Sequence, residues 1–168
     1  AEKKGIKVIN TPNASSLSVA ELVFAHLFSL TRNIYHSNRT MPLEADFNFK
    51  KLKKQYSNGK ELKGKKIGII GFGRIGVEVA KIAIGIGMQV LFHDPYIEKK
   101  IISIDFFNNK SIEFELTKTD FNDLLKKSDI ITIHIPKQNK SLINKKELQK
   151  MKKGSLIINT SRGGIINE

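Results

Sequence analysis

The chain lacks several features that would assign it to a protein class. Its 168 residues contain no cysteine, which excludes a disulfide framework and every thiolate metal site. The four histidines, at positions 26, 36, 93 and 134, have no zinc-binding spacing, so we expect no metal site. Purely apolar stretches last a few residues, far short of the roughly 20 that a membrane span needs. No signal-type apolar run follows the first residues. We therefore expect a cytoplasmic protein with no membrane partner.

Acidic residues are also scarce, since 16 of them face 29 basic ones and leave a formal net charge of +13. Such a charge is typical of nucleic-acid binders. Only four basic residues are arginine, the side chain best suited to base edges and phosphates. The lysines are spread in pairs without interleaved aromatics, which indicates a solvated surface and no nucleic-acid partner. The alternative, a nucleic-acid binder, predicts an affinity that collapses with salt.

A chain of this length, 40% hydrophobic, suffices for one compact domain that buries roughly 70% of its unfolded surface. It begins without methionine and stops just after a glycine pair. We expect a piece of a longer protein.

The first third of the chain predicts one strand and one helix. Residues 5–10 alternate as in a short strand and run into a turn cluster at 11–13. Ser18 and Glu21 form a capping box that opens a long amphipathic helix, with His26 as a packed core residue on its apolar stripe. Residues 36–64 are polar and lysine-rich, so we interpret them as an ordered excursion or linker.

The remainder alternates strands and helices. We expect strands at 66–70, 89–93, 130–135 and 156–159, and helices over 75–86, 120–127 and from residue 145, where Asn144 caps the helix. Segments 102–106 and 112–116 alternate around a turn and predict a β-hairpin. Such an order implies an α/β fold, a doubly wound parallel sheet with helices on both faces and an inserted hairpin.

A glycine turn carries the chemistry. Gly71, Gly73 and Gly76 follow a predicted strand and open a helix, and Asp94 ends the next strand. In the Rossmann dinucleotide fingerprint these glycines permit the tight turn, the approach of a pyrophosphate and close helix packing, and the acidic residue binds the ribose hydroxyls. The alternative is a turn that needs glycine for packing alone.

NAD is favoured over NADP. An Asp94 carboxylate would repel a 2′-phosphate, and neither Pro95 nor Tyr96 offers it a cation. Arg74, inside the turn, could reach the pyrophosphate through its guanidinium or through its backbone amide.

Several motifs in order resemble the NAD-binding domain of the D-2-hydroxyacid dehydrogenase family. They cover segments 5–12, 18–21, 62–76, 93–95, 129–136 and 159–168. The stretch 38–42 and the hairpin at 101–118 resemble the branch that oxidises D-3-phosphoglycerate with NAD, the entry step of serine synthesis. Other open alternatives are a hydroxypyruvate or glyoxylate reductase and a non-enzymatic NAD-sensing corepressor.

The resemblance implies hydride transfer between a 2-hydroxy acid and nicotinamide. It assigns Arg162 to the substrate's carboxylate and carbonyl oxygen, a task that suits a permanently charged guanidinium fork; the alternative is a buried ion-pair arginine. The resemblance assigns Ile75 to the glycine turn, Ile135 and Pro136 to the adenosine and ribose side, and Thr160 and Ser161 to the nicotinamide side. Asn167 stands where many relatives have Asp, which weakens any role for that position.

The resemblance also implies a domain organisation. Residues 1–12 would be the last strand of a mostly missing substrate domain, 13–64 a crossover helix and linker, and 65–168 the NAD-binding domain, truncated at its C-terminus. The family's catalytic His and Glu would then lie outside this chain, with His134 a cofactor-loop residue at most. We expect a homodimer or higher homo-oligomer, and expect residues 1–168 alone to be inactive.

Overall fold

The computed structural model describes residues 2–11 and 14–168. After a 3₁₀ turn at Glu2–Lys4, the elements follow in this order: α1 (Ser16–Thr31), α2 (Ile34–Tyr56), β1 (Lys66–Ile70), α3 (Arg74–Gly85), β2 (Gln89–His93), β3 (Lys99–Asp105), β4 (Ser111–Thr117), α4 (Phe121–Lys127), β5 (Ile130–Ile133), α5 (Lys145–Lys150) and β6 (Leu156–Asn159).

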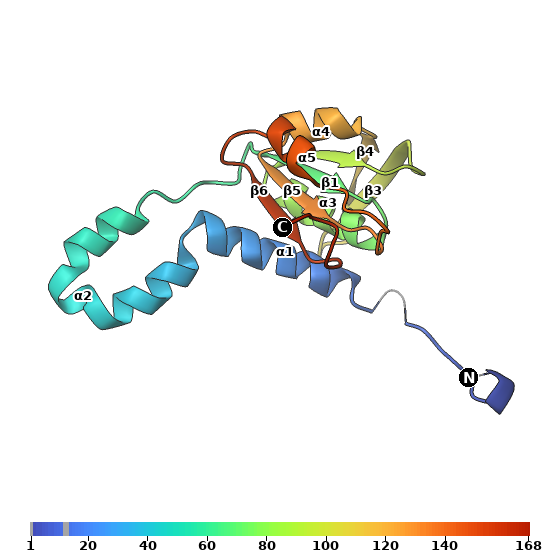
Figure 1. Cartoon of the computed structure of the whole chain (residues 1–168), viewed down its shortest axis with the longest axis horizontal. Helices are drawn as coiled ribbons and strands as arrows, with labels where there is room; N and C mark the ends of the chain where they lie inside the picture. Colours follow the sequence, from blue (N-terminus) through green and yellow to red (C-terminus); the bar gives the residue numbers. More distant parts are fainter. Residues whose placement is uncertain (1, 12–13) are drawn as a thin grey trace.

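A four-stranded parallel sheet in the order β2-β1-β5-β6 forms the centre. From β1 the chain winds outward to β2 on one side, and later through β5 to β6 on the other. The helix α1 lies along one face of the sheet and α4 along the other (Figure 1). The predicted doubly wound α/β fold is therefore confirmed, and its switch point lies between β1 and β5.

Strand alternation divides the apolar side chains into two cores. Ile67, Ile69 and Phe92 join Val23 and Leu27 of α1 in the core beneath α1 and α3. A second core packs against α4 and contains Ile70, Leu124, Leu125, Ile131 and Ile133. Each inner strand is buried on both faces, which is why these strands are rich in isoleucine.

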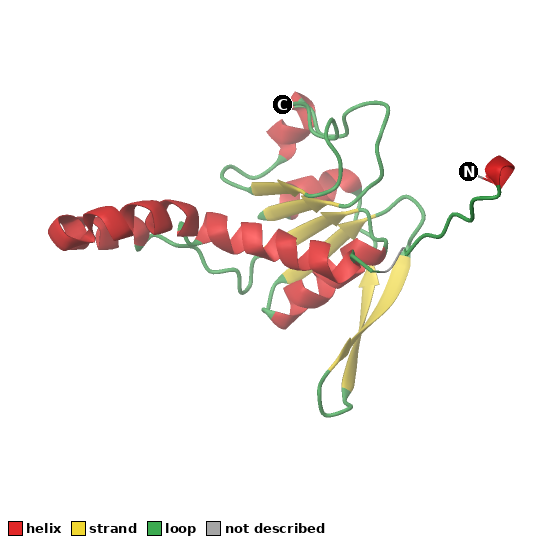
Figure 2. Ribbon diagram, turned by 90° about the horizontal axis from the view of Figure 1, so that it is seen from below, coloured by secondary structure: helices red, strands yellow, loops and turns green. Residues whose placement is uncertain are grey.

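The hairpin is formed by β3 and β4, which pair only with each other and project from the body (Figure 2). Its buried residue Ile102 and the partly buried Phe114 and Leu116 pack into the α1/α3 core. Phe107 at the turn is fully exposed. The hairpin predicted from its alternation is confirmed.

The start of the chain differs from expectation. Residues 6–11 form no strand and extend away from the body (Figure 1), because a strand requires a hydrogen-bonding neighbour and the described residues offer none. Of the predicted turn at 11–13, residues 12 and 13 lie outside the described residues. The assignment of 1–12 to a second domain stays a prediction.

The prediction of a capping box at Ser18 and Glu21 was wrong. The helix α1 begins three residues earlier than a Ser18 N-cap would place it, with Ser15 at its N-cap and no side-chain cap bond. His26 is exposed, not packed in the core, since Ala20, Val23, Phe24 and Leu27 make the stripe that faces the sheet. The expected stripe was too wide because Leu22 and Leu30 are apolar but point to solvent.

The linker expected within 36–64 is mostly helix. The helix α2 starts after Asn33, whose φ of 56° turns the chain, and changes direction at the non-helical Asn48. A hydrogen bond of 2.7 Å joins the Thr40 and Tyr56 hydroxyls across this bend. The helix stands away from the sheet (Figure 1). The sequence did not indicate this helix because Pro42 lies inside it, and proline normally ends or kinks a helix.

None of the helices in the described part of the chain combines the length and hydropathy that a membrane crossing requires.

Candidate functional site

The predicted residues meet at the carboxyl edge of the sheet, beside its switch point. Ile70 pairs with His93 and Ile133, and Ile133 pairs with Asn159. One residue further along each strand come Asp94, Gly71, His134 and Thr160. These four form one row across the sheet, and strand alternation assigns them to the α1/α3 face. In open parallel sheets this edge is where ligands bind.

Two of the glycines are required by the fold itself, because a side chain there would overlap the backbone. Gly71 has a φ of +91°, and a Cβ on it would overlap the carbonyl of His134. A Cβ on Gly76 would overlap the carbonyl oxygen of Gly71. These positions let the turn lie against β5 and against the first turn of α3.

Gly73 is different, because a Cβ there would meet nothing within 4 Å. It is the N-cap of α3, and no side chain caps the helix. The amide groups of the first turn are therefore left without a side-chain acceptor at the positive end of the helix dipole. Open space in front of free amides fits a phosphate group, and this distinguishes the turn from one that needs glycine for packing alone.

Asp94 is buried and anchors the turn. Its Oδ2 accepts a hydrogen bond of 2.8 Å from the backbone N–H of Phe72, and its Oδ1 accepts one of 2.9 Å from that of Tyr96. The Phe72 ring stacks on Phe92 with ring centroids 4.0 Å apart. A carboxylate has about four acceptor sites, so Asp94 retains capacity for ribose hydroxyls.

A hollow of about 320 Å³ gathers most of the remaining predicted residues. It is lined by Ser15, Val19, Ile75, His134, Ile135, Pro136, Thr160, Ser161 and Arg162. A second hollow, of about 650 Å³, is lined by Gly73 and Arg74 together with Phe72, Ile97 and Lys100. Ile75 thus borders the first hollow while Gly73 and Arg74 border the second, so the first turn of α3 lies beside both, as an extended dinucleotide requires.

Arg162 is exposed, and among the described residues no carboxylate lies within ion-pair distance of it. Its Nη1 donates to the carbonyl oxygen of Ser161 at 2.8 Å. This is not the environment of a buried ion-pair arginine. The guanidinium is available to an anion.

His134 also lines the first hollow. Burial lowers its pKa to about 4, so the ring is neutral at neutral pH. Its Nε2 lies 2.8 Å from Thr132 Oγ1. Within the described residues, His134 Nδ1 and Thr160 Oγ1 are buried without a hydrogen-bond partner. The signal in the sequence for a histidine at this edge of the sheet was its position at the end of an otherwise apolar strand.

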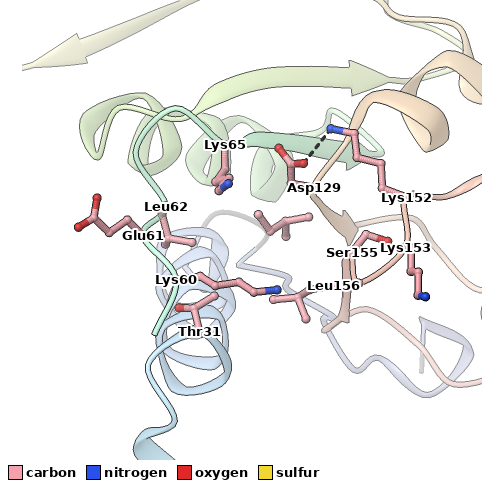
Figure 3. A pocket seen from close by; sticks show the side chains of 12 residues that line it. Thr31, Lys60, Glu61, Leu62, Lys65, Asp129, Lys152, Lys153, Ser155 and Leu156 are labelled. Carbon is pink, nitrogen blue, oxygen red and sulfur yellow. Dashed lines mark hydrogen bonds and ion pairs between the residues drawn. The ribbon is translucent and has the colours of Figure 1, made fainter. Parts of the chain in front are cut away.

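A different hollow lies at the opposite, amino edge of the sheet (Figure 3). It measures about 300 Å³ and contains none of the predicted site residues. Asp129 lies there and accepts bonds of 2.8 Å from Lys66 N and Lys152 Nζ. Burial acts to raise the pKa of Asp129, but these two hydrogen bonds hold it below its usual value. These hydrogen bonds join the segments at the starts of β1, β5 and β6, which is a structural role.

Among the described residues, no three potential metal-ligating side chains come together.

Residues 24–168 match a family model described as D-isomer specific 2-hydroxyacid dehydrogenase, NAD binding domain. Over its whole length the chain is 39% identical to half of a hydroxypyruvate reductase from Thermotoga maritima. It is also 39% identical to 30% of a D-3-phosphoglycerate dehydrogenase from Methanocaldococcus jannaschii. The chain thus spans half or less of these relatives' length.

Solved structures agree with the fold. The D-lactate dehydrogenase of Escherichia coli superposes with a TM-score of 0.74 at 32% identity, over 99% of this chain and 48% of that one. An NAD-dependent formate dehydrogenase from Staphylococcus aureus, solved with NAD, gives 0.70 at 32% identity, over 91% of this chain and 42% of that one.

Proposed function

Because this chain belongs to the D-isomer specific 2-hydroxyacid dehydrogenase family, whose NAD-binding domain it carries, we propose that it serves the NAD-dependent oxidation of D-3-phosphoglycerate to 3-phosphohydroxypyruvate. The observation that carries the chemistry is the hollow that brings exposed Arg162 together with Ile75 and Thr160. The choice of substrate is supported by whole-chain identities of 39% and 38% to D-3-phosphoglycerate dehydrogenases from M. jannaschii and Bacillus subtilis.

Each part of the cofactor has candidate partners in this chain. The free amides of α3, with Arg74 beside them, suit the pyrophosphate. Asp94 suits the adenosine ribose, with Ile135 and Pro136 on that side, and Thr160 and Ser161 suit the nicotinamide end. When bound, NAD supplies the ring that accepts the hydride.

Arg162 orients the substrate. Its guanidinium offers paired N–H donors to the carboxylate and the C2 oxygen of a 2-hydroxy acid. Negative charge that develops on these oxygens is stabilised by a donor already fixed at the edge of the sheet. His134 is a poor general base, because partial burial lowers its pKa to about 4. We assign the proton to the family's His and Glu, for which this chain offers no matching position.

A second substrate is favoured by one observation, the 39% identity to the T. maritima hydroxypyruvate reductase. A glyoxylate reductase from Thermofilum pendens is 36% identical. The test measures kcat/KM of the intact dehydrogenase for 3-phosphohydroxypyruvate, hydroxypyruvate and glyoxylate, each with NADH. A preference for 3-phosphohydroxypyruvate over hydroxypyruvate in the reductive direction supports the proposal, whereas the reverse preference contradicts it.

We also propose a homodimer that pairs through α1 and α2. Large apolar side chains are exposed along both helices, namely Leu22, Phe28, Leu30, Ile34, Tyr35, Leu43, Phe47 and Phe49. An exposed apolar surface of this extent is typical of a protein interface. A second copy is the occupant because symmetric self-pairing is the commonest assembly of soluble proteins.

A further inference from the structure

We propose that Asn159 is the positioning residue for Arg162, holding the turn that presents its guanidinium to the substrate. The inference rests on the proposed function, in which Arg162 binds the 2-hydroxy acid. Asn159 is the last residue of β6, where the sheet ends and the turn to Arg162 begins.

Both ends of the Asn159 amide are used on this turn. Its Oδ1 accepts a hydrogen bond of 3.1 Å from the backbone N–H of Ser161 and one of 2.7 Å from the Ser161 hydroxyl. Its Nδ2 donates to the carbonyl oxygen of Arg162 at 2.9 Å. One side chain therefore closes the whole turn from 159 to 162.

Asn159 is itself held by the sheet, since it pairs with Ile133 in the β5–β6 ladder. Arg162 has no such support of its own. Among the described residues, its side chain hydrogen-bonds only to the carbonyl oxygen of Ser161, which belongs to the same turn. The position of Arg162 relative to the sheet is thus transmitted through Asn159.

The chemistry requires asparagine in particular. A carboxylate in its place would keep the bonds from Ser161 but would set an oxygen against the Arg162 carbonyl oxygen, where no proton is available. The same contacts give Ser161 and Thr160, both predicted for the nicotinamide side, different hydrogen bonding. The Ser161 hydroxyl is directed to Asn159 and fixes the turn, whereas Thr160 Oγ1 has no partner among the described residues.

The experiment uses Asn159→Ala, Asn159→Asp and Arg162→Lys, singly and combined, in the intact dehydrogenase. We expect each Asn159 variant to lower kcat/KM for the 2-hydroxy acid by about 10- to 100-fold, because misplacement of a binding group by about 1 Å costs that much. The Kd of NADH should change much less, by no more than a few-fold, because the groups proposed for the pyrophosphate and the adenosine ribose lie on α3 and at Asp94, away from this turn. Asn122→Ala is the matched control, since Asn122 lies on α4 and bonds only to surrounding surface groups.

The kinetics of the double variants test whether Asn159 acts through Arg162. If Asn159 acts through Arg162, its substitution has little further effect once Arg162 is already lysine, and the double variant resembles Arg162→Lys. Fully additive losses would overturn the proposal, as would normal kinetics in the Asn159 variants beside a strong defect in Arg162→Lys. Should Asn159→Ala fail to fold, the Asn159→Asp cycle, which keeps the Ser161 bonds, gives the same decision. Full activity of Arg162→Lys alone would contradict the proposed function itself.

Discussion

The carboxylate of Asp94 lies 2.8 Å from the backbone nitrogen of Phe72 and accepts its hydrogen bond. The acidic residue at the end of β2 is thereby joined to the glycine turn after β1 before any ligand arrives. Its charge is fixed in place at the position where an adenosine ribose would lie.

Replacing this charge should change cofactor choice. We expect Asp94→Ser to lose about 1.5–3 kcal/mol of NAD affinity and to remove the repulsion of NADP, because a charge-assisted hydrogen bond disappears. Asp94→Asn is the control that keeps an oxygen for the Phe72 amide but loses the charge. Calorimetric titration of both cofactors measures the preference, and an unchanged NAD/NADP ratio in both variants contradicts the assignment.

Two glycines of one turn should respond in opposite ways. Gly71→Ala forces a side chain into a φ of +91° and onto the His134 carbonyl, so we expect a loss of unfolding free energy of about 2 kcal/mol or more. Gly73→Ala meets only open space and should leave the melting temperature nearly unchanged. Its NADH affinity should nonetheless fall about tenfold, because the methyl group occupies the phosphate's approach. Normal NADH binding by Gly73→Ala would remove the argument for that site.

Arg162 should matter for substrate and not for the fold. We expect Arg162→Lys in the intact dehydrogenase to preserve the melting temperature and NAD binding but to lower kcat/KM strongly, since an ammonium cannot reproduce the fork. The exposed position of Arg162 leads to this expectation. Loss of stability with little kinetic defect would support a structural role instead.

His134 should make stability depend on pH. Burial holds its folded-state pKa at about 4, below the unfolded value of about 6.5, so on acidification the unfolded chain takes up the proton first. Its contribution is fully present above pH ~6.5 and is lost as pH falls through about 4, a total of about 3 kcal/mol. Denaturant unfolding at pH 7 and at pH 4.5 measures it. His134→Gln should flatten this dependence while His26→Gln, at an exposed position, should not; equal slopes in the two variants would refute the assignment.

Charge on the exposed face of α2 should prevent pairing. Leu43 and Phe47 are 76% and 81% exposed, so Leu43→Glu with Phe47→Glu costs little in the isolated fold. We expect sedimentation equilibrium to show a dimer for the parent and a monomer for the variant. Replacing the exposed Lys54 with Glu on the same helix changes the net charge by the same amount and is the control for charge alone. An undiminished dimer in the apolar-site variant would place the interface elsewhere.

Local patterns in the sequence were enough for the βαβ unit, the hairpin and the helix after Asn144. In each of these elements the apolar period and the turn residues lie within a few positions of one another, and Asn144 was readable as the N-cap, where its backbone N–H donates to the Glu147 carboxylate at 3.0 Å. The family resemblance rested partly on the βαβ unit, through segments 62–76 and 93–95. The spacing of four site residues was enough to predict a dinucleotide-binding turn, namely Gly71, Gly73, Gly76 and Asp94.

Tertiary structure decided the rest. The helix α2 contains Pro42 and buries almost none of its length, so its sequence did not indicate a helix, and the side of α1 that faces the sheet depends on which partner covers it. Asp94, Gly71, His134 and Thr160 are far apart in the sequence, and only the parallel register of four strands puts them in one row. The burial that neutralises His134 and the three bonds by which Asn159 holds the Arg162 turn arise from packing between segments. The sequence determined which residues could bind a dinucleotide, and strand pairing determined which of them meet, because register is set by contacts across the sheet and not along the chain.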